Sequence, residues 1–176
     1  MTDLLVREMT LPDCLRVSGI RIRGWRNAYA GLMPQPYLDG LDVAADAARR
    51  RERFGAPGVV NLVAELGGEV VGWACHGPCR DDDARAGDVE LYAVYVEPDR
   101  IGTGVGRALL RESARRSAAA GYERMLLWVL ERNTRARRFY ERAGFAPDGA
   151  EEPFDVDGVS VPEVRYAGAL ADVGSG

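Results

Sequence analysis

The chain has 176 residues, of which 47% are hydrophobic and 28% are charged, and its net charge is −4. This size suits one domain with a full hydrophobic core, and the composition is ordinary for a soluble globular protein. A net negative charge argues against general nucleic-acid binding, and one histidine and three cysteines, with no Cys-x-x-Cys pattern, argue against a metal site.

No apolar run approaches the roughly 18 residues of a membrane-spanning helix, and the N-terminus does not resemble a signal peptide. We therefore expect a cytoplasmic protein with reduced thiols, no membrane segment and no metal.

Alternating strand and helix periods predict one α+β domain over residues 1–170, with a flexible tail over 171–176. The predicted strands cover residues 4–7, 59–66, 69–76, 89–96 and 122–130, and apolar segments at 145, 154–156 and 164–167 close the sheet. The first predicted helix begins at a capping pattern over 10–13 and extends to residue 29. Three more helices are predicted over 43–54, 104–120 and 133–143. The loop over 80–87 carries three consecutive aspartates, which we expect to be solvated.

Three alternating glycines follow the strand at 89–96 and precede a helical pattern. Glycine allows a sharp turn and a close approach of the backbone to a ligand, and a helix N-terminus favours an anion. The segment therefore predicts a pyrophosphate site, although a plain tight turn would use the same residues. A P-loop is excluded because the chain contains no lysine, and the glycine spacing does not match a Rossmann fingerprint.

A second pattern lies on the predicted helix over 133–143. Asn133 suits its N-cap and Gly144 suits the position just after its end. Asn133 and Tyr140 are seven residues apart, so they lie on nearly the same helical face. An amide and a phenol are thus expected to point in one direction, beside the strand that neighbours the glycine loop.

These two motifs, in this order, resemble those of the GNAT superfamily of acetyl-CoA-dependent N-acyltransferases. The resemblance implies a single-domain, mostly antiparallel sheet flanked by helices, with the fourth and fifth strands splayed around the CoA site. Ile101 stands where the family usually has Gln or Arg, so Arg100 or Arg107 is a candidate for the missing charge. The residues expected at acetyl-CoA are Val94, Tyr95, Val96, Ile101, Gly102, Thr103, Gly104, Val105, Gly106, Arg107, Asn133 and Tyr140.

The resemblance also implies roles in catalysis. Tyr140 is expected to protonate the departing thiolate, although it equally suits a core position at helical spacing. Asn133 is expected to hydrogen-bond the pantetheine arm, and the alternative is that it only caps the helix. Glu90 is the expected base, on the face of its strand shared with Tyr92, Val94 and Val96 and opposite Leu91, Ala93 and Tyr95; the alternative for Glu90 is an edge salt bridge. His76, on the neighbouring strand, is the rival base.

The acceptor is expected to be a small primary amine. It is expected to meet acetyl-CoA in a ternary complex, because nothing in the chain resembles an activated Cys or Ser that could carry the acetyl group. Trp25, Tyr29 and Met33, together with His76, are the candidates for its pocket, and the aromatic spacing equally suits a stripe that faces the core. The resemblance allows a homodimer. The main alternative is an acyl-CoA-binding or sensing module without turnover.

Overall fold

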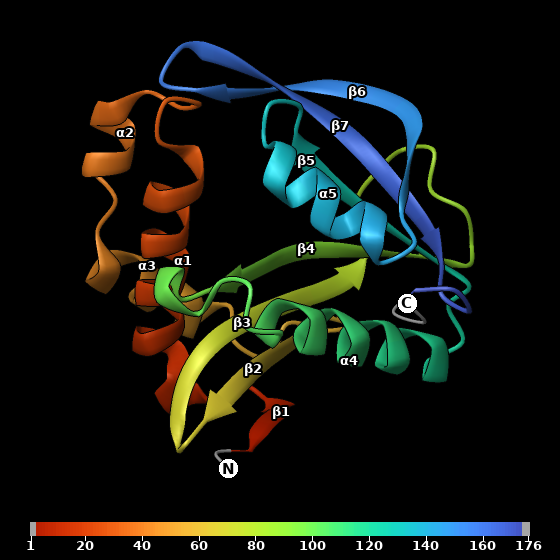
Figure 1. The fold of residues 1–176 in the computed structure, drawn as a ribbon, viewed down its shortest axis with the longest axis horizontal. Helices are drawn as coiled ribbons and strands as arrows, with labels where there is room; N and C mark the ends of the chain where they lie inside the picture. Colours follow the sequence, from red (N-terminus) through yellow and green to blue (C-terminus); the bar gives the residue numbers. More distant parts are fainter. Residues whose placement is uncertain (1–2, 174–176) are drawn as a thin grey trace.

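Seven strands form a single mixed sheet in the computed structural model, which describes residues 3–173. Their spatial order is β1-β2-β3-β4-β5-β7-β6, and among these neighbours only β4 and β5 run parallel (Figure 1). The strands are β1 (Leu4–Glu8), β2 (Val60–Leu66), β3 (Glu69–Pro78), β4 (Asp88–Val96), β5 (Arg124–Leu130), β6 (Ala146–Val156) and β7 (Val159–Ala169). The helices are α1 (Cys14–Tyr29), α2 (Gln35–Asp39), α3 (Val43–Glu52), α4 (Val105–Ala119) and α5 (Thr134–Arg142).

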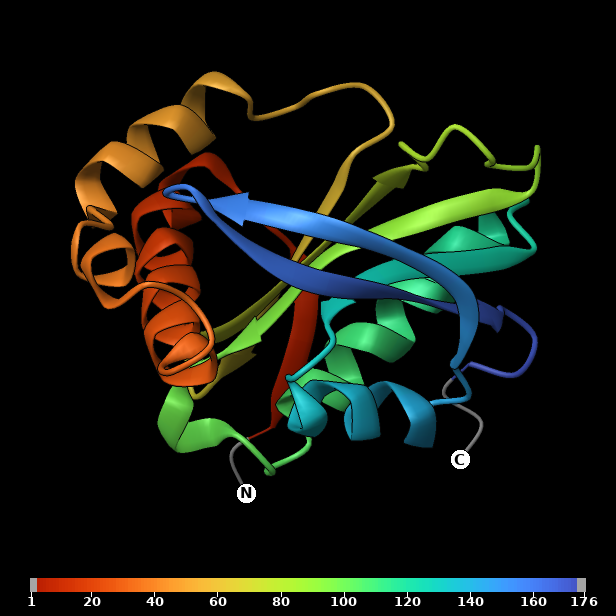
Figure 2. The ribbon, with the colours of Figure 1, turned by 90° about the horizontal axis from the view of Figure 1, so that it is seen from above.

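Helices cover both faces of the sheet, and Figure 2 shows α1 to α3 on one side and α4 and α5 on the other. Alternate residues of β2 and β3 supply the two cores, as the strand period requires. Val63 and Trp73 pack with α1, whereas Leu62 and Ala74 pack with α4. The predicted α+β fold with a splayed, mostly antiparallel sheet is confirmed.

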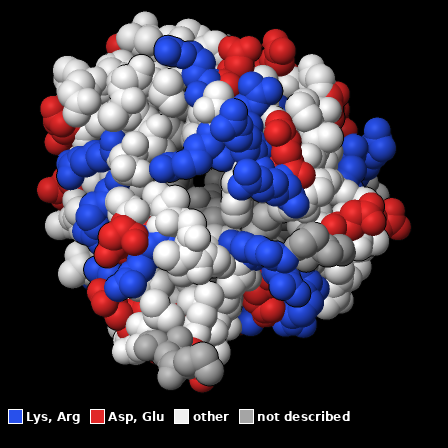
Figure 3. Space-filling model, in the orientation of Figure 1, with Lys and Arg blue, Asp and Glu red and all other residues white. Residues whose placement is uncertain are grey.

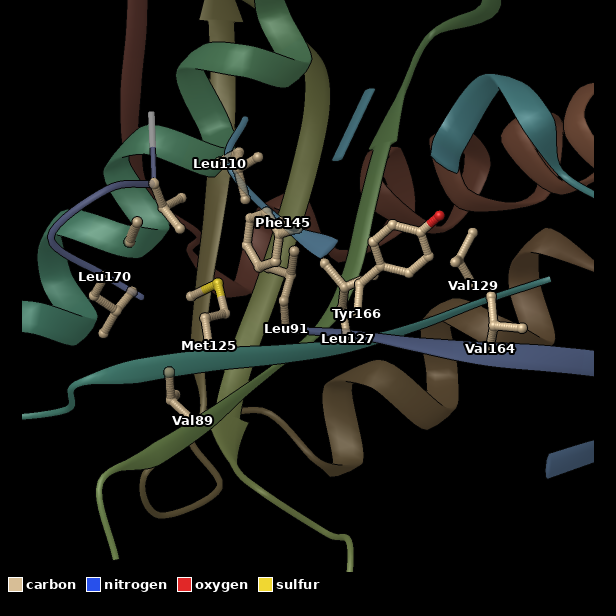
Figure 4. Packing of buried hydrophobic residues seen from close by; sticks show 12 residues of the cluster. Val89, Leu91, Leu110, Met125, Leu127, Val129, Phe145, Val164, Tyr166 and Leu170 are labelled. Carbon is tan, nitrogen blue, oxygen red and sulfur yellow. The ribbon is translucent and has the colours of Figure 1, made fainter. Parts of the chain in front are cut away.

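The C-terminal hairpin joins the core beneath α4 and α5. Figure 4 shows Phe145, Tyr166 and Leu127 with their side chains directed into one cluster. The fully buried Tyr166 accepts a hydrogen bond from Arg137 and donates one to Glu141, both at 2.8 Å. These bonds tie α5 to β7 and fix the face that α5 presents to the middle of the sheet.

The parallel pair in the sheet is short. β4 and β5 pair only over Asp88–Glu90 and Arg124–Leu126, while β5 continues beside β7 as far as Leu130. The two strands therefore diverge after Glu90, and the second half of β4 has an edge that no strand covers within the described residues.

A β-bulge makes one prediction for β4 wrong. His76 pairs with Leu91 and Cys75 pairs with Ala93, so Tyr92 is an extra residue in β4. An extra residue reverses the alternation beyond it. Leu91 consequently faces the α4 side with Val94, and Ala93 and Tyr95 face α1.

Two further expectations are corrected. The closing strands are longer than predicted, because β6 and β7 form one hairpin around a turn at Asp157 and Gly158. Val173 is buried in the core, so the ordered chain extends beyond residue 170; residues 174–176 lie outside the described part.

The aspartates of the 80–87 loop are not simply solvated. Asp81 and Asp83 both bind Arg165 of β7. Among residues 3–173, no helix combines the length and apolar character needed to span a bilayer, and no three His, Cys, Asp or Glu side chains gather as metal ligands.

Candidate active site

A cleft of about 920 Å³ opens where β4 and β5 diverge. Its walls come from the second half of β4, the end of β5, the glycine loop, and residues of α1, α4, α5 and β7. The two ends of this cleft differ in chemistry. We call them the arginine end, formed by the lining residues within 100–111 and 133–142 other than Tyr140, and the tyrosine end, formed by Tyr29, Tyr95, Tyr140 and Glu163.

The glycine loop turns the chain into α4 at the arginine end. Gly102 and Gly104 have φ angles of 81° and 93°, a region that side chains with a Cβ rarely occupy. The first hydrogen bond of α4 runs from the Ala108 N–H to the Gly104 carbonyl. The N–H groups of Val105 and Gly106 precede it and have no partner inside the helix, which is the arrangement that binds phosphate at helix N-termini.

Six arginines line the arginine end and give it an excess of basic side chains. They are Arg100, Arg107, Arg111, Arg135, Arg138 and Arg142. Figure 3 shows blue side chains gathered around a hollow on the face that carries α4 and α5. Among the described residues that line the cleft, Glu163 is the only acid. Guanidinium groups bind phosphate through charge-assisted hydrogen bonds, so this end suits a phosphorylated ligand.

The uncovered edge of β4 crosses the middle of the cleft. Glu97 donates its N–H to the Val71 carbonyl on β3. Hydrogen-bonded pairs alternate along an antiparallel ladder, so Tyr95 bonds to β3 in the same way, and Val94 and Val96 present their backbone groups to the opposite edge. That edge suits an extended ligand that carries amide groups.

Three tyrosines meet at the tyrosine end. The hydroxyls of Tyr29 on α1 and Tyr95 on β4 are 3.2 Å apart. Gly24 lets α1 pass close to the Tyr95 ring, since a Cβ there would lie 3.0 Å from Cδ1. Burial raises the pKa of all three phenols, and the charge of Glu163 contributes at Tyr29 and Tyr95. The Tyr140 phenol therefore keeps its proton at neutral pH.

Most of the predicted acetyl-CoA ligands do line this cleft. These are Val94, Tyr95, Val96, Ile101, Gly102, Gly104, Gly106, Arg107, Asn133 and Tyr140. Thr103 and Val105 do not: the Thr103 hydroxyl donates to the Arg100 carbonyl, and the Val105 side chain is buried beneath α4. Asn133 caps α5 by accepting the Ala136 N–H at 3.2 Å, and it also lines the cleft, so the two readings are compatible.

The two predicted bases lie outside the cleft lining. Glu90 is 2% exposed and accepts two hydrogen bonds from the Arg80 guanidinium and one from the Arg80 N–H. These contacts favour the salt-bridge alternative over the base role. His76 faces α4 and hydrogen-bonds Ser113, and burial lowers its pKa to about 4, so its placement in the acceptor site is wrong.

The predicted acceptor pocket divides between cleft and core. Tyr29 lines the cleft. Trp25 and Met33 instead pack in a cluster with Leu38 and Val161, and Met33 is 6% exposed. Trp25 on α1 and Met33 after it thus take the core-facing alternative, packed against α2, the end of β5 and the β6–β7 hairpin.

Sequence reasoning missed Glu163 and four of the six arginines. The arginines had a signal, since Arg135, Arg138 and Arg142 recur at helical spacing on one face of α5. No sequence signal pointed to Glu163, because the residues near it do not indicate that β7 pairs with β5.

Comparisons with known proteins show the family of the chain. A sequence model of the acetyltransferase (GNAT) family matches residues 23–145. The chain is 33% identical over 162 residues to the uncharacterized N-acetyltransferase YuaI of Bacillus subtilis, across 90% of this chain and 89% of that protein.

Solved structures share the fold. The PaiA N-acetyltransferase of Thermoplasma acidophilum, in complex with coenzyme A, has a TM-score of 0.73 at 17% identity and covers 95% of this chain and 99% of its own. YncA of Salmonella typhimurium, with its cofactor acetyl-CoA, has a TM-score of 0.70 at 24% identity, with coverages of 95% and 94%.

Proposed function

The chain belongs to the acetyltransferase (GNAT) family and is an acetyl-CoA-dependent acyltransferase, and from this premise we propose its acceptor and mechanism. It transfers an acetyl group directly to a small primary amine bound in the same cleft. The observation that carries the proposal is one cleft with two unlike ends, one suited to phosphates and one whose lining includes the protonated Tyr140 phenol and the Glu163 carboxylate.

Acetyl-CoA fits the residues of the arginine end and the β4 edge. An added Cβ at Gly102 or Gly104 would meet no protein atom within 4 Å, so the loop leaves open space beside its backbone. The pyrophosphate takes the N–H groups of this loop, and the arginines on α4 and α5 supply the charge that Ile101 lacks. The pantetheine amides take the backbone groups of Val94 and Val96.

Acetyl-CoA supplies an activated acetyl group as its thioester. In the proposed mechanism Tyr140 gives its proton to the sulfur as the thiolate leaves, and burial supports this role because it keeps the phenol protonated.

No covalent acetyl-enzyme is needed. Burial raises the pKa of the free thiols Cys14, Cys75 and Cys79, that of Cys75 to about 12, so all three are poor nucleophiles at neutral pH. None of the three lines the cleft. The amine therefore attacks the thioester directly, with both substrates bound together.

The test is a screen of primary amines monitored by release of free CoA thiol. The panel holds phenethylamine, cadaverine, spermidine and free amino acids, with N-terminally acetylated lysine peptides as protein-like acceptors. Because the chain has no lysine, its own side chains add no competing acceptor amine. Thiol release with a small amine, and little with the peptides, supports the proposal. A protein that binds acetyl-CoA by calorimetry and releases no thiol with any amine is instead a sensing module.

A further inference from the structure

Glu163 is a carboxylate placed in the cleft without a protein partner. It lies on β7, between Leu130 of β5 and Glu152 of β6 in the strand register, and it is half-buried. Within residues 3–173, no hydrogen bond or ion pair reaches its side chain. A half-buried carboxylate that no protein donor satisfies is suited to a ligand that brings its own N–H groups or positive charge.

Strand alternation places Glu163 on the same face as Val161 and Arg165, and Val161 packs toward α1 and α2. Arg165, the nearest cation on its own strand, is already bound to Asp81, Asp83 and Asp148. Charged or titratable groups also approach Glu163 from the other elements around it. They are Tyr29 on α1, Arg80 after β3, Glu90 and Tyr95 on β4, and Glu152 on β6, and Tyr140 on α5 lines the same cleft.

These surroundings disfavour the ionised form of Glu163. Burial raises its pKa to about 7, the charges of Glu152 and Glu90 add to this effect, and Arg80 opposes it. A carboxylate with a pKa near the working pH can both accept a proton and release it again. Glu90 lacks this freedom, because Arg80 holds it with three hydrogen bonds.

We propose that Glu163 is the catalytic base: it binds the ammonium group of the acceptor at the tyrosine end and takes up the proton that frees the nucleophile. This inference rests on the proposed function, and it narrows the acceptor to amines that arrive in the cleft as cations.

The proposed acetyl transfer conserves protons and electrons. Glu163 removes one proton from the ammonium group and passes it to solvent, which leaves a neutral amine with a free electron pair. That pair forms the C–N bond, and the C–S electron pair leaves on sulfur, which takes the Tyr140 proton. The nitrogen loses its second proton as the amide forms, and this proton replaces the one that Tyr140 gave. The products are the acetamide, free CoA thiol and one proton.

The experiment measures kcat/KM against pH for the fastest-reacting amine of the panel. In the parent, kcat/KM rises as pH passes through about 7, because Glu163 acts only when it is ionised. Glu163→Gln should lower kcat/KM about 10²–10⁴-fold and abolish that inflection, with acetyl-CoA affinity unchanged. The substitution removes a carboxylate that has no protein partner, so the variant should fold normally.

Two variants sharpen the result. Glu152→Gln lies outside the cleft lining and removes a charge that raises the pKa of Glu163, so the inflection should move to lower pH while the plateau rate stays. Glu90→Gln should keep the inflection but move it to lower pH, because the Glu90 charge also raises the pKa of Glu163. Independently of turnover, NMR of 13C-labelled glutamate carboxyls should show one group titrating near pH 7 that is missing in Glu163→Gln.

The outcomes separate the two proposals. A parent protein without thiol release overturns the proposed function. A parent that turns over while Glu163→Gln keeps its rate and its inflection overturns the base assignment alone. Loss of the inflection in Glu90→Gln, with Glu163→Gln unaffected, assigns the base to Glu90 instead.

Discussion

The arginine end and the tyrosine end of the cleft are built in different ways. Every residue of the arginine end comes from two continuous segments, each a turn followed by a helix. The tyrosine end draws one residue each from α1, β4, α5 and β7, so its members are up to 134 positions apart, from Tyr29 to Glu163.

This difference explains how each end depends on the rest of the fold. Local backbone geometry forms the arginine end, because glycine conformation and helix periodicity are properties of neighbouring residues. The tyrosine end exists only when the sheet, its bulge and the C-terminal hairpin have all formed. Substitutions at the two ends should therefore change different quantities, and four of them test this.

The largest kinetic effect is expected for Tyr140→Phe. The ring and its packing against Phe139 and Phe145 remain, but the proton donor is lost. We expect kcat to fall about 10²–10⁴-fold with acetyl-CoA affinity unchanged. Single-turnover thiol release measures the chemical step. Tyr122→Phe, which changes a tyrosine outside the cleft lining, is the matched control. Full single-turnover rates in Tyr140→Phe would make Tyr140 a packing residue.

Met33→Ala tests whether Met33 belongs to the hydrophobic core beside the tyrosine end or to the acceptor pocket. Met33 is buried with Leu38 and Val156, so its truncation should lower the free energy of unfolding by about 2–5 kcal/mol. Urea denaturation measures this change. Leu15→Ala on α1, where the leucine is 51% exposed, should have little effect. A selective rise in amine KM with normal stability would return Met33 to the acceptor pocket.

The arginine end is tested by the pair Arg138→Gln and Arg142→Gln. Each removes a cation from the lining of the cleft, and together they should weaken CoA binding about tenfold, the scale of one charge-assisted hydrogen bond. Calorimetry at two salt concentrations checks this, since the loss should shrink at high salt. Arg132→Gln, an exposed arginine outside the lining, is the control; an equal loss there would mean that only net charge matters.

The smallest effect is expected for Tyr29→Phe. It removes the hydroxyl that pairs with Tyr95, and one neutral hydrogen bond contributes about 1 kcal/mol, so the amine KM should rise about fivefold. Steady-state kinetics with saturating acetyl-CoA measures the change. A variant that weakens acetyl-CoA binding instead would place Tyr29 beside the cosubstrate.

The sequence alone determined the fold class, the glycine loop and the helix that carries Asn133 and Tyr140, because each is specified by neighbouring residues. Gly102 and Gly104 do have positive φ angles, and Asn133 does cap α5. The helical spacing of Arg135, Arg138 and Arg142 was equally readable.

Only the tertiary structure decided which carboxylate faces the cleft. Strand alternation predicted the faces of β4 correctly only up to the bulge at Tyr92, whose presence depends on pairing with β3. Arg80 holds Glu90 because the loop after β3 folds back over β4. Glu163 lines the cleft because β7 pairs with the edge of β5 that faces away from β4. Such long-range pairing cannot be predicted from the residues around Glu163.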